Sequence, residues 1–196
     1  MSRISLWERV TGVTLFGRAP EAIFAAIGLL AMSPFLLLAA LAISIESRGG
    51  VLHRDRRIGK DGREFDMWRL RTTFRTAEQS RPGLTGVGRV LRETSLDYVP
   101  LLINVVRGDM ALVGPRPDPP LIAEHYTELE RGRLAVKPGF AGWEQINHYL
   151  SPLPEAERYE LDLWYIEHRS WRLHLKILAL STTLPIRKPI VRPLAD

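Results

Sequence analysis

The chain has 196 residues, with 27 Lys and Arg against 22 Asp and Glu, a formal charge of +5 and no cysteine. This length fits one domain, and the lack of cysteine excludes a disulfide framework and a thiol nucleophile. The basic balance is compatible with nucleic acid, anionic lipid or a phosphorylated substrate, but the sequence has no RNA-binding signature, zinc-ligand spacing or helix-turn-helix pattern, so we expect no nucleic-acid partner.

An uncharged segment at residues 22–45 follows a mixed, basic lead-in. It is long enough to cross the roughly 30 Å hydrocarbon core of a bilayer as one helix. Ser33 and Pro34 lie near its middle, where proline bends a helix and serine can bond a carbonyl that the bend frees. Basic residues flank both ends, which favours placing both ends on the cytoplasmic side. A spanning helix and a re-entrant helix both stay open, and we expect no cleaved signal peptide.

Residues 51–72 predict a β-hairpin. Two short runs of alternating character flank a turn with Gly59 and the pair Asp61-Gly62. Asp-Gly between two short runs is a strong hairpin signal. The basic side chains of these runs suit either phosphates or anionic headgroups. Residues 73–88 are polar and rich in Gly, Ser and Thr, which predicts a loop.

Residues 94–117 carry the strongest pattern in the chain. A Thr-Ser pair at the start is suited to cap a helix, Asp97 follows in the first turn, and the Arg-Gly pair at 107–108 is suited to the helix end. A carboxylate at a helix N-terminus is stabilised as the anion by roughly 0.3–1 kcal/mol, which would keep Asp97 ionised and able to act as a nucleophile. The alternative is an acid that only matches the helix dipole.

The segment at 115–120 is too rich in proline for a helix interior or a central strand, so it predicts an ordered turn or an extended segment. Rigid backbone around Arg116 suits a phosphate clamp, because arginine offers a planar fork of donors to phosphate oxygens. An arginine that bridges two loops is the alternative interpretation.

Three further helices are predicted, at residues 121–134, 155–168 and 170–184, with a turn that carries Trp143 after the first. Acidic residues along the first predict a solvated helix. The last is apolar, and its side chains fit either a membrane surface or the protein core.

Five ordered motifs resemble those of the bacterial sugar transferases, the monotopic phosphoglycosyl transferases. They are RIGKDGREF at 57–65, WRLRT at 68–72, the pattern at 94–117, VKPGFAGW at 136–143 and LHLKI at 173–177. The resemblance implies an α+β, mainly helical fold with a small β-hairpin and surface helices. It implies a lead-in and a re-entrant helix-break-helix membrane anchor at 1–46, and a catalytic-type domain at 47–196 that forms one structural unit with the anchor. We therefore expect the protein to be located on the cytoplasmic face of the cell inner membrane.

What the resemblance implies for function is transfer of a sugar 1-phosphate from a UDP-sugar to polyprenol phosphate at the membrane, with magnesium and a covalent phosphosugar on an aspartate. Asp97 matches the nucleophile and Arg116 the phosphate-binding arginine. Arg92 matches the arginine five residues before the nucleophile. Arg69 stands where the family usually has lysine, a change that keeps the charge and alters the geometry.

Several residues depart from the family pattern. Tyr98 replaces the glutamate that supports the metal, and a phenol with a reference pKa near 10 is a poor magnesium ligand. His148 and Tyr149 stand where Gly-Arg-Asn often occurs, and His174 replaces an aspartate. Glu144 replaces a small residue and is expected to return the missing carboxylate. The predicted site therefore comprises Asp97, Tyr98 and His174 as catalytic residues, Arg69, Arg92, Arg116, His148 and Tyr149 as substrate-binding residues, and Asp97 and Glu144 as magnesium ligands.

Three functional hypotheses follow. The first is an active phosphoglycosyl transferase with an altered metal site or sugar nucleotide. The second is a membrane enzyme of the same fold that performs another transfer with Asp97. The third is a catalytically silent scaffold of a glycan or metabolite pathway. Retention of Asp97 and Arg116 argues against the third, and loss of the glutamate at position 98 argues against the first.

Overall fold

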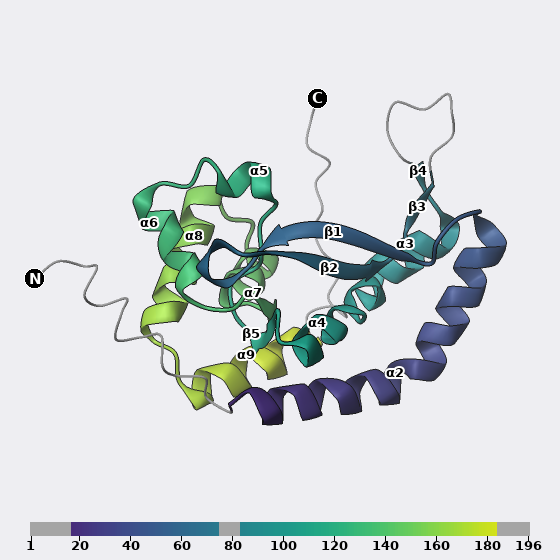
Figure 1. Cartoon of the computed structure of the whole chain (residues 1–196), viewed down its shortest axis with the longest axis horizontal. Coiled ribbons are helices and arrows are strands. Elements are labelled where there is room, and N and C mark those ends of the chain that lie inside the picture. The colour runs from purple at the N-terminus through teal and green to yellow at the C-terminus, as the bar shows by residue number, and fades with distance from the viewer. Residues whose placement is uncertain (1–16, 75–82, 184–196) are drawn as a thin grey trace, which may run out of the picture.

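The computed structural model describes residues 17–74 and 83–183, so the first 16 residues of the lead-in expected at residues 1–21 lie outside the described part. Figure 1 shows a long helix, α2 (Arg18–Glu46), along one side of the molecule and a long hairpin across its middle. Shorter helices gather at the end of the hairpin where its two strands are joined. The predicted mainly helical chain with small sheets is confirmed.

Among the described residues, α2 is the one helix long and apolar enough to cross a membrane. Most of its apolar side chains are exposed, so it is not a core helix. Pro34 lies inside it, and the Ser33 hydroxyl donates to the Leu30 carbonyl at 2.7 Å. Figure 1 shows α2 bent, with two arms at a wide angle. The helix is thus bent and continuous where a break was predicted, and the re-entrant path through a bilayer stays a prediction.

The hairpin is confirmed. Strands β1 (Leu52–Ile58) and β2 (Glu64–Leu70) are antiparallel, with Asp55 opposite Met67. A 3-10 turn, η1 (Lys60–Gly62), joins them. Asp61 has φ 57° and Gly62 has φ 75°, backbone conformations that Asp and Gly tolerate better than other residues. The Asp-Gly signal therefore identified the turn correctly.

The single helix predicted from residue 94 is wrong. Helix α3 (Gly86–Glu93) ends before it, a 3-10 turn η2 (Leu96–Tyr98) follows, and α4 (Leu101–Arg107) begins only after Pro100. Pro100 has no N–H to bond back to a carbonyl one turn earlier, so a regular α-helix cannot run through it from residue 95. The predicted helix end is confirmed, because Gly108 caps α4 with φ 88°.

The remaining described residues form two short sheets and six helical segments. Strands β3 (Thr73–Phe74) and β4 (Gly83–Leu84) are antiparallel, and β5 (Ala111–Val113) and β6 (Gly139–Ala141) are parallel. The helical segments are α5 (Pro120–Ala123), α6 (Glu128–Arg131), the 3-10 helix η3 (Gly132–Ala135), α7 (Trp143–Leu150), α8 (Glu155–Glu167) and α9 (Trp171–Thr183).

Two of the predicted helices are confirmed as α8 and α9, and one is wrong. The segment 121–134 is split because Thr127 starts a new helix: its hydroxyl accepts from the Glu130 N–H, and the Glu130 carboxylate accepts from the Thr127 N–H. Trp143, predicted to lie in a turn, is the first residue of α7, and the residues before it form β6.

Hydrophobic cores hold the elements of the site in place. The core that joins α2 to α4 and β2 contains Ala25, Met67, Leu101, Val105 and Met110. A second core lies under α8 and α9, where Ile177 is fully buried while Trp171 and Leu175 of the same helix are about half exposed. Helix α9 therefore has a core face, as one of its two interpretations predicted, and an exposed apolar face, for which contact with a membrane surface stays a prediction.

Candidate active site

Asp97 lies at the corner between α3 and α4. The preceding Ser95 has φ 58°, a left-handed conformation that is uncommon for a non-glycine residue and often marks functional sites. The Asp97 side chain is only 3% exposed, and its Oδ1 atom has no hydrogen-bond partner in the described residues. A buried carboxylate oxygen without a donor is costly, so this position calls for an explanation other than stability.

Three arginines from separate elements act on Asp97. Arg69 comes from β2, Arg92 from α3 and Arg116 from the proline-rich segment. Burial raises the pKa of the Asp97 carboxyl above its ordinary value, and the positive charges of the three arginines oppose this rise. The predicted stabilisation of the anion at a helix start is thus one contribution, since the Asp97 backbone N–H also lowers the pKa of this carboxyl, and the charges of Arg69 and Arg92 contribute more.

Tyr98 joins two of these arginines. Its hydroxyl oxygen accepts one hydrogen bond from Arg69 and one from Arg116, both at 3.2 Å. The two guanidinium carbons lie 5.2 and 5.9 Å from the centre of the Tyr98 ring. Tyr98 thus holds two arginines next to Asp97, whereas the family pattern has a glutamate at this position that supports the metal.

Sequence analysis missed the residues that hold Arg69 and Arg92. Asp55 forms an ion pair with Arg69 at 2.8 Å. The register could have revealed this pair, since Asp55 and Arg69 are diagonal neighbours on one face of the hairpin. The buried Thr72 hydroxyl accepts from Arg92 Nε at 3.0 Å. No local pattern predicts that contact, because the two residues come from segments that meet only in the fold.

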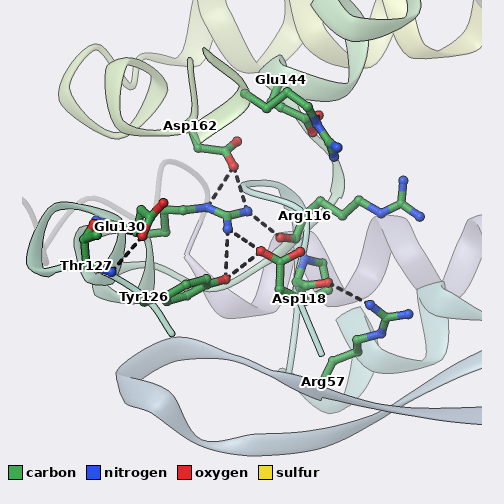
Figure 2. A network of polar contacts seen from close by, with 11 residues as sticks. Arg57, Arg116, Asp118, Tyr126, Thr127, Glu130, Glu144 and Asp162 are labelled. Atoms are coloured by element: carbon green, nitrogen blue, oxygen red, sulfur yellow. Dashed lines mark hydrogen bonds and ion pairs between the residues drawn. The ribbon is translucent and has the colours of Figure 1, made fainter. Parts of the chain in front are cut away.

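Arg133 holds the backbone of Arg116 and was also missed. Its guanidinium donates to the Arg116 carbonyl at 2.8 Å, pairs with Asp118, and lies 2.8 Å from Asp162. The Tyr126 hydroxyl donates to Asp118 at 2.6 Å. Figure 2 shows that the Arg116 side chain extends away from this network while its carbonyl takes part in it. Burial, and to a smaller extent the negative charge of Glu144, raises the pKa of Asp162 to about 7, while the charge of Arg133 opposes this rise.

Close backbone packing fixes the start of the proline-rich segment. The Gly139 N–H donates to the Pro115 carbonyl at 2.9 Å, and a Cβ on Gly139 would lie 2.0 Å from the Gly114 nitrogen. On its other side, the Ile58 N–H donates to the Asp118 carbonyl at 3.0 Å. The predicted ordered segment around Arg116 is confirmed, and it is tied to the hairpin and to β6.

Comparison with known proteins identifies the family. The model of the family described as "Bacterial sugar transferase" matches residues 13–188. The chain belongs to the bacterial sugar transferase family. A sugar transferase of Bacillus subtilis, the uncharacterized EpsL, is 36% identical over 179 residues, which cover 85% of this chain and 84% of that protein.

Two longer relatives have named activities. The UDP-glucose:undecaprenyl-phosphate glucose-1-phosphate transferase of Escherichia coli (strain K12) is 38% identical over 182 residues, or 85% of this chain and 39% of that protein. The UDP-N-acetylgalactosamine-undecaprenyl-phosphate N-acetylgalactosaminephosphotransferase of Aeromonas hydrophila is 31% identical over 85% of this chain and 42% of that protein. The present chain therefore spans about two fifths of the length of these two relatives.

The other four predicted site residues make contacts away from the three arginines that act on Asp97. His174 Nε2 lies 2.8 Å from the Tyr165 hydroxyl, and burial and the charge of Arg169 lower its pKa to about 4. His148 Nδ1 accepts from the Leu153 N–H at 3.0 Å. Tyr149 packs on the core under α8 and α9. The buried Glu144 pairs with Arg158. The contacts of His174, His148 and Glu144 are thus made with groups other than Asp97.

The two carboxylates predicted to bind magnesium, Asp97 and Glu144, have different surroundings. Among residues 17–74 and 83–183, no group of three His, Cys, Asp or Glu side chains is placed to hold a metal ion. One Glu144 oxygen pairs with Arg158, and its other oxygen, like Oδ1 of Asp97, has no hydrogen-bond partner among the described residues. Asp97 is the carboxylate that lies in the field of the three arginines, where a diphosphate would bring further oxygen ligands. Mg²⁺ often takes only one or two carboxylates and completes its shell with water and substrate phosphates. A role for magnesium therefore stays a prediction that concerns Asp97 alone.

Proposed function

We propose that this chain transfers a sugar 1-phosphate from a UDP-sugar to polyprenol phosphate, with Asp97 as the nucleophile. The observation that carries the proposal is the buried Asp97 carboxylate, which has one unpartnered oxygen and lies within the field of three arginines. A nucleophile needs a free oxygen, and a diphosphate substrate needs several fixed cations. Relatives whose names specify UDP-glucose or UDP-N-acetylgalactosamine with undecaprenyl phosphate support the same chemistry.

The reaction has two displacements. In the first, an Asp97 carboxylate oxygen attacks the phosphorus that carries the sugar, the bond from that phosphorus to the bridging oxygen breaks, and UMP leaves with the electron pair. In the second, a phosphate oxygen of polyprenol phosphate attacks the same phosphorus and releases the Asp97 carboxylate. The product is a polyprenyl diphosphate sugar, and no external proton source or oxidant is needed.

The arginines stabilise the charge that develops on the phosphates. Arg69 and Arg116 are held together by the Tyr98 hydroxyl, and Arg92 is held by Thr72. Fixed donors need little reorganisation as the negative charge moves to the leaving UMP, which is the main physical source of such catalysis. A magnesium ion, when bound at Asp97, would supply further positive charge to the diphosphate.

The membrane location supports a lipid acceptor. We propose that α2 anchors the chain in the inner membrane and re-enters the cytoplasmic leaflet. The Asp97 cluster, which consists of Asp97, Tyr98, Arg69, Arg92 and Arg116, would then lie at the level of the headgroups. The exposed apolar surface of α2 and its bend support this arrangement. The packing of α2 against α4 supports a short, fixed distance between the anchor and Asp97, which lies just before α4.

The test is UMP release by detergent-purified protein with a panel of UDP-sugars, polyprenol phosphate and magnesium. The Asp97→Asn variant keeps the size of the side chain and removes the nucleophilic charge. Asp61→Asn is the matched control, because Asn also tolerates the left-handed conformation of the hairpin turn. We expect release with the wild type and the control and none with Asp97→Asn. Silence of the folded wild type across the panel would favour another transfer reaction or a scaffold.

A further inference from the structure

A cavity of about 90 Å³ lies apart from the Asp97 cluster. Its charged lining comes from five places in the fold: the first turn of α2, the hairpin turn, the residues before β6, the connection from α8 to α9, and α9 itself. The residues concerned are Arg18, Glu21, Lys60, Lys137, Arg169 and His174. None of Asp97, Tyr98 or their three arginines lines this cavity.

The lining is strongly basic. Four cationic side chains face one carboxylate, that of Glu21. His174 adds no charge near neutral pH, because burial and the charge of Arg169 lower its pKa to about 4. The Tyr165 hydroxyl donates to the Val113 carbonyl at 3.1 Å, so it accepts from the His174 Nε2–H. His174 is therefore a neutral donor in the wall, and the cavity keeps a clear excess of positive charge.

Three of these cations, those of Lys60, Lys137 and Arg18, are poorly compensated. The half-buried side chains of Lys60 and Lys137 make no hydrogen bond and no short ion pair with any described residue, although the charge of Lys137 acts on Glu21. The Arg18 guanidinium makes one long hydrogen bond, to the Arg107 carbonyl at 3.4 Å. Partly desolvated cations that lack partners are unfavourable, and a bound anion would offset that cost.

The size of the cavity limits the anion. A site for one water needs about 10–15 Å³ on this measure, and a pocket for a drug-sized ligand has about 300–1,000 Å³. The cavity is therefore large enough for a phosphate group and too small for a sugar nucleotide. We propose that it binds a phosphate group, either that of a lipid headgroup beside the first turn of α2 or free phosphate. This inference does not depend on the proposed transfer reaction.

The experiment measures phosphate binding to the full chain in detergent by titration calorimetry, with inorganic phosphate and with detergent-dispersed phosphatidic acid. The double variant Lys60→Gln, Lys137→Gln should lose at least tenfold in affinity. Arg131→Gln removes one exposed positive charge elsewhere and should change nothing. Because the Asp97 cluster can also attract phosphate, Arg116→Gln serves as a second reference and should keep the component that depends on the two lysines.

The two probes separate the sources of the phosphate. Binding of phosphatidic acid that inorganic phosphate displaces assigns the cavity to a lipid headgroup, and binding of inorganic phosphate alone assigns it to the free ion. Either result supports a phosphate site if the lysine double variant, with an unchanged unfolding temperature, loses it. The proposal is overturned if neither probe binds, if the double variant binds like the wild type, or if Arg116→Gln abolishes all binding. UMP release is a separate readout, so failure here leaves the transferase proposal standing.

Discussion

The Tyr98 hydroxyl accepts a hydrogen bond from Arg116 at 3.2 Å, and it accepts a second one from Arg69 at the same distance. One oxygen thus fixes two cations from separate elements next to Asp97. Since tyrosine stands here where the family pattern has a glutamate, we propose that Tyr98 and its two arginines hold substrate charge in place of a carboxylate that supports a metal.

Tyr98→Phe should lower kcat/KM for UMP release about 10-fold or more, because a hydrogen bond to a charged group contributes about 1.5–3 kcal/mol. The ring remains, so the cation–π contacts and the packing should persist and the unfolding temperature should change little. Steady-state kinetics and a thermal melt check both parts. Wild-type kinetics in this variant would mean that the hydroxyl does not position the arginines.

Glu144→Gln should leave the magnesium dependence of UMP release unchanged, because Glu144 forms an ion pair with Arg158, whereas Asp97 lies in the field of the three arginines that we propose bind the diphosphate. Manganese binding, followed by electron paramagnetic resonance, should be weak in the free protein and stronger when a UDP-sugar supplies phosphate ligands. Asp97→Asn should weaken that second binding step. A metal affinity that falls in Glu144→Gln would restore Glu144 as a ligand.

Asp97→Asn should raise the unfolding temperature at neutral pH. The folded-state pKa of Asp97 is raised above the ordinary value of 3.8, so its contribution to stability is complete below that value and is lost as pH rises through the folded pKa. At pH 7 the ionised carboxylate is therefore a cost that the amide lacks. Thermal melts at pH 7 and near pH 4 should show a gain for the variant at pH 7 that shrinks on acidification. An equal gain at both values would rule out this origin.

Arg133→Met should destabilise the fold by about 3–5 kcal/mol, because it leaves the buried Asp162 and the half-buried Asp118 without their shared cation. It should also raise KM for the UDP-sugar, since the Arg116 carbonyl loses its donor. Urea unfolding measures the first effect and UMP release the second. The exposed Arg131→Gln is the control and should stay within about 0.5 kcal/mol of the wild type. A similarly small change in Arg133→Met would show that the network contributes little.

Local signals in the sequence predicted local structure. The Asp61-Gly62 pair identified the hairpin, and Gly108 identified the end of α4, because both depend on backbone conformations that few residues tolerate. The motif pattern also named Asp97, Arg69, Arg92 and Arg116, which the fold brings together. Their assignment to catalysis still rests on the experiments above.

The remaining contacts could not be predicted because they join distant segments. Arg133 reaches Arg116 and Asp162 only after the helical segments pack, and Glu144 finds Arg158 rather than the Asp97 cluster. The corner at Ser95 was missed because a capping signal was given more weight than Pro100, which stops a helix from running through. Residue types and spacing do not fix which charges meet in the fold.

The most direct test of the central claim is the mass of the protein after incubation with a UDP-sugar and no polyprenol phosphate. We expect one UMP released per protein molecule and a mass increase equal to one phosphosugar, which maps to Asp97. The Asp97→Asn variant should show neither the release nor the mass increase. Addition of polyprenol phosphate should remove the label. UMP release without any labelled protein, or a label on another residue, would contradict Asp97 as the nucleophile.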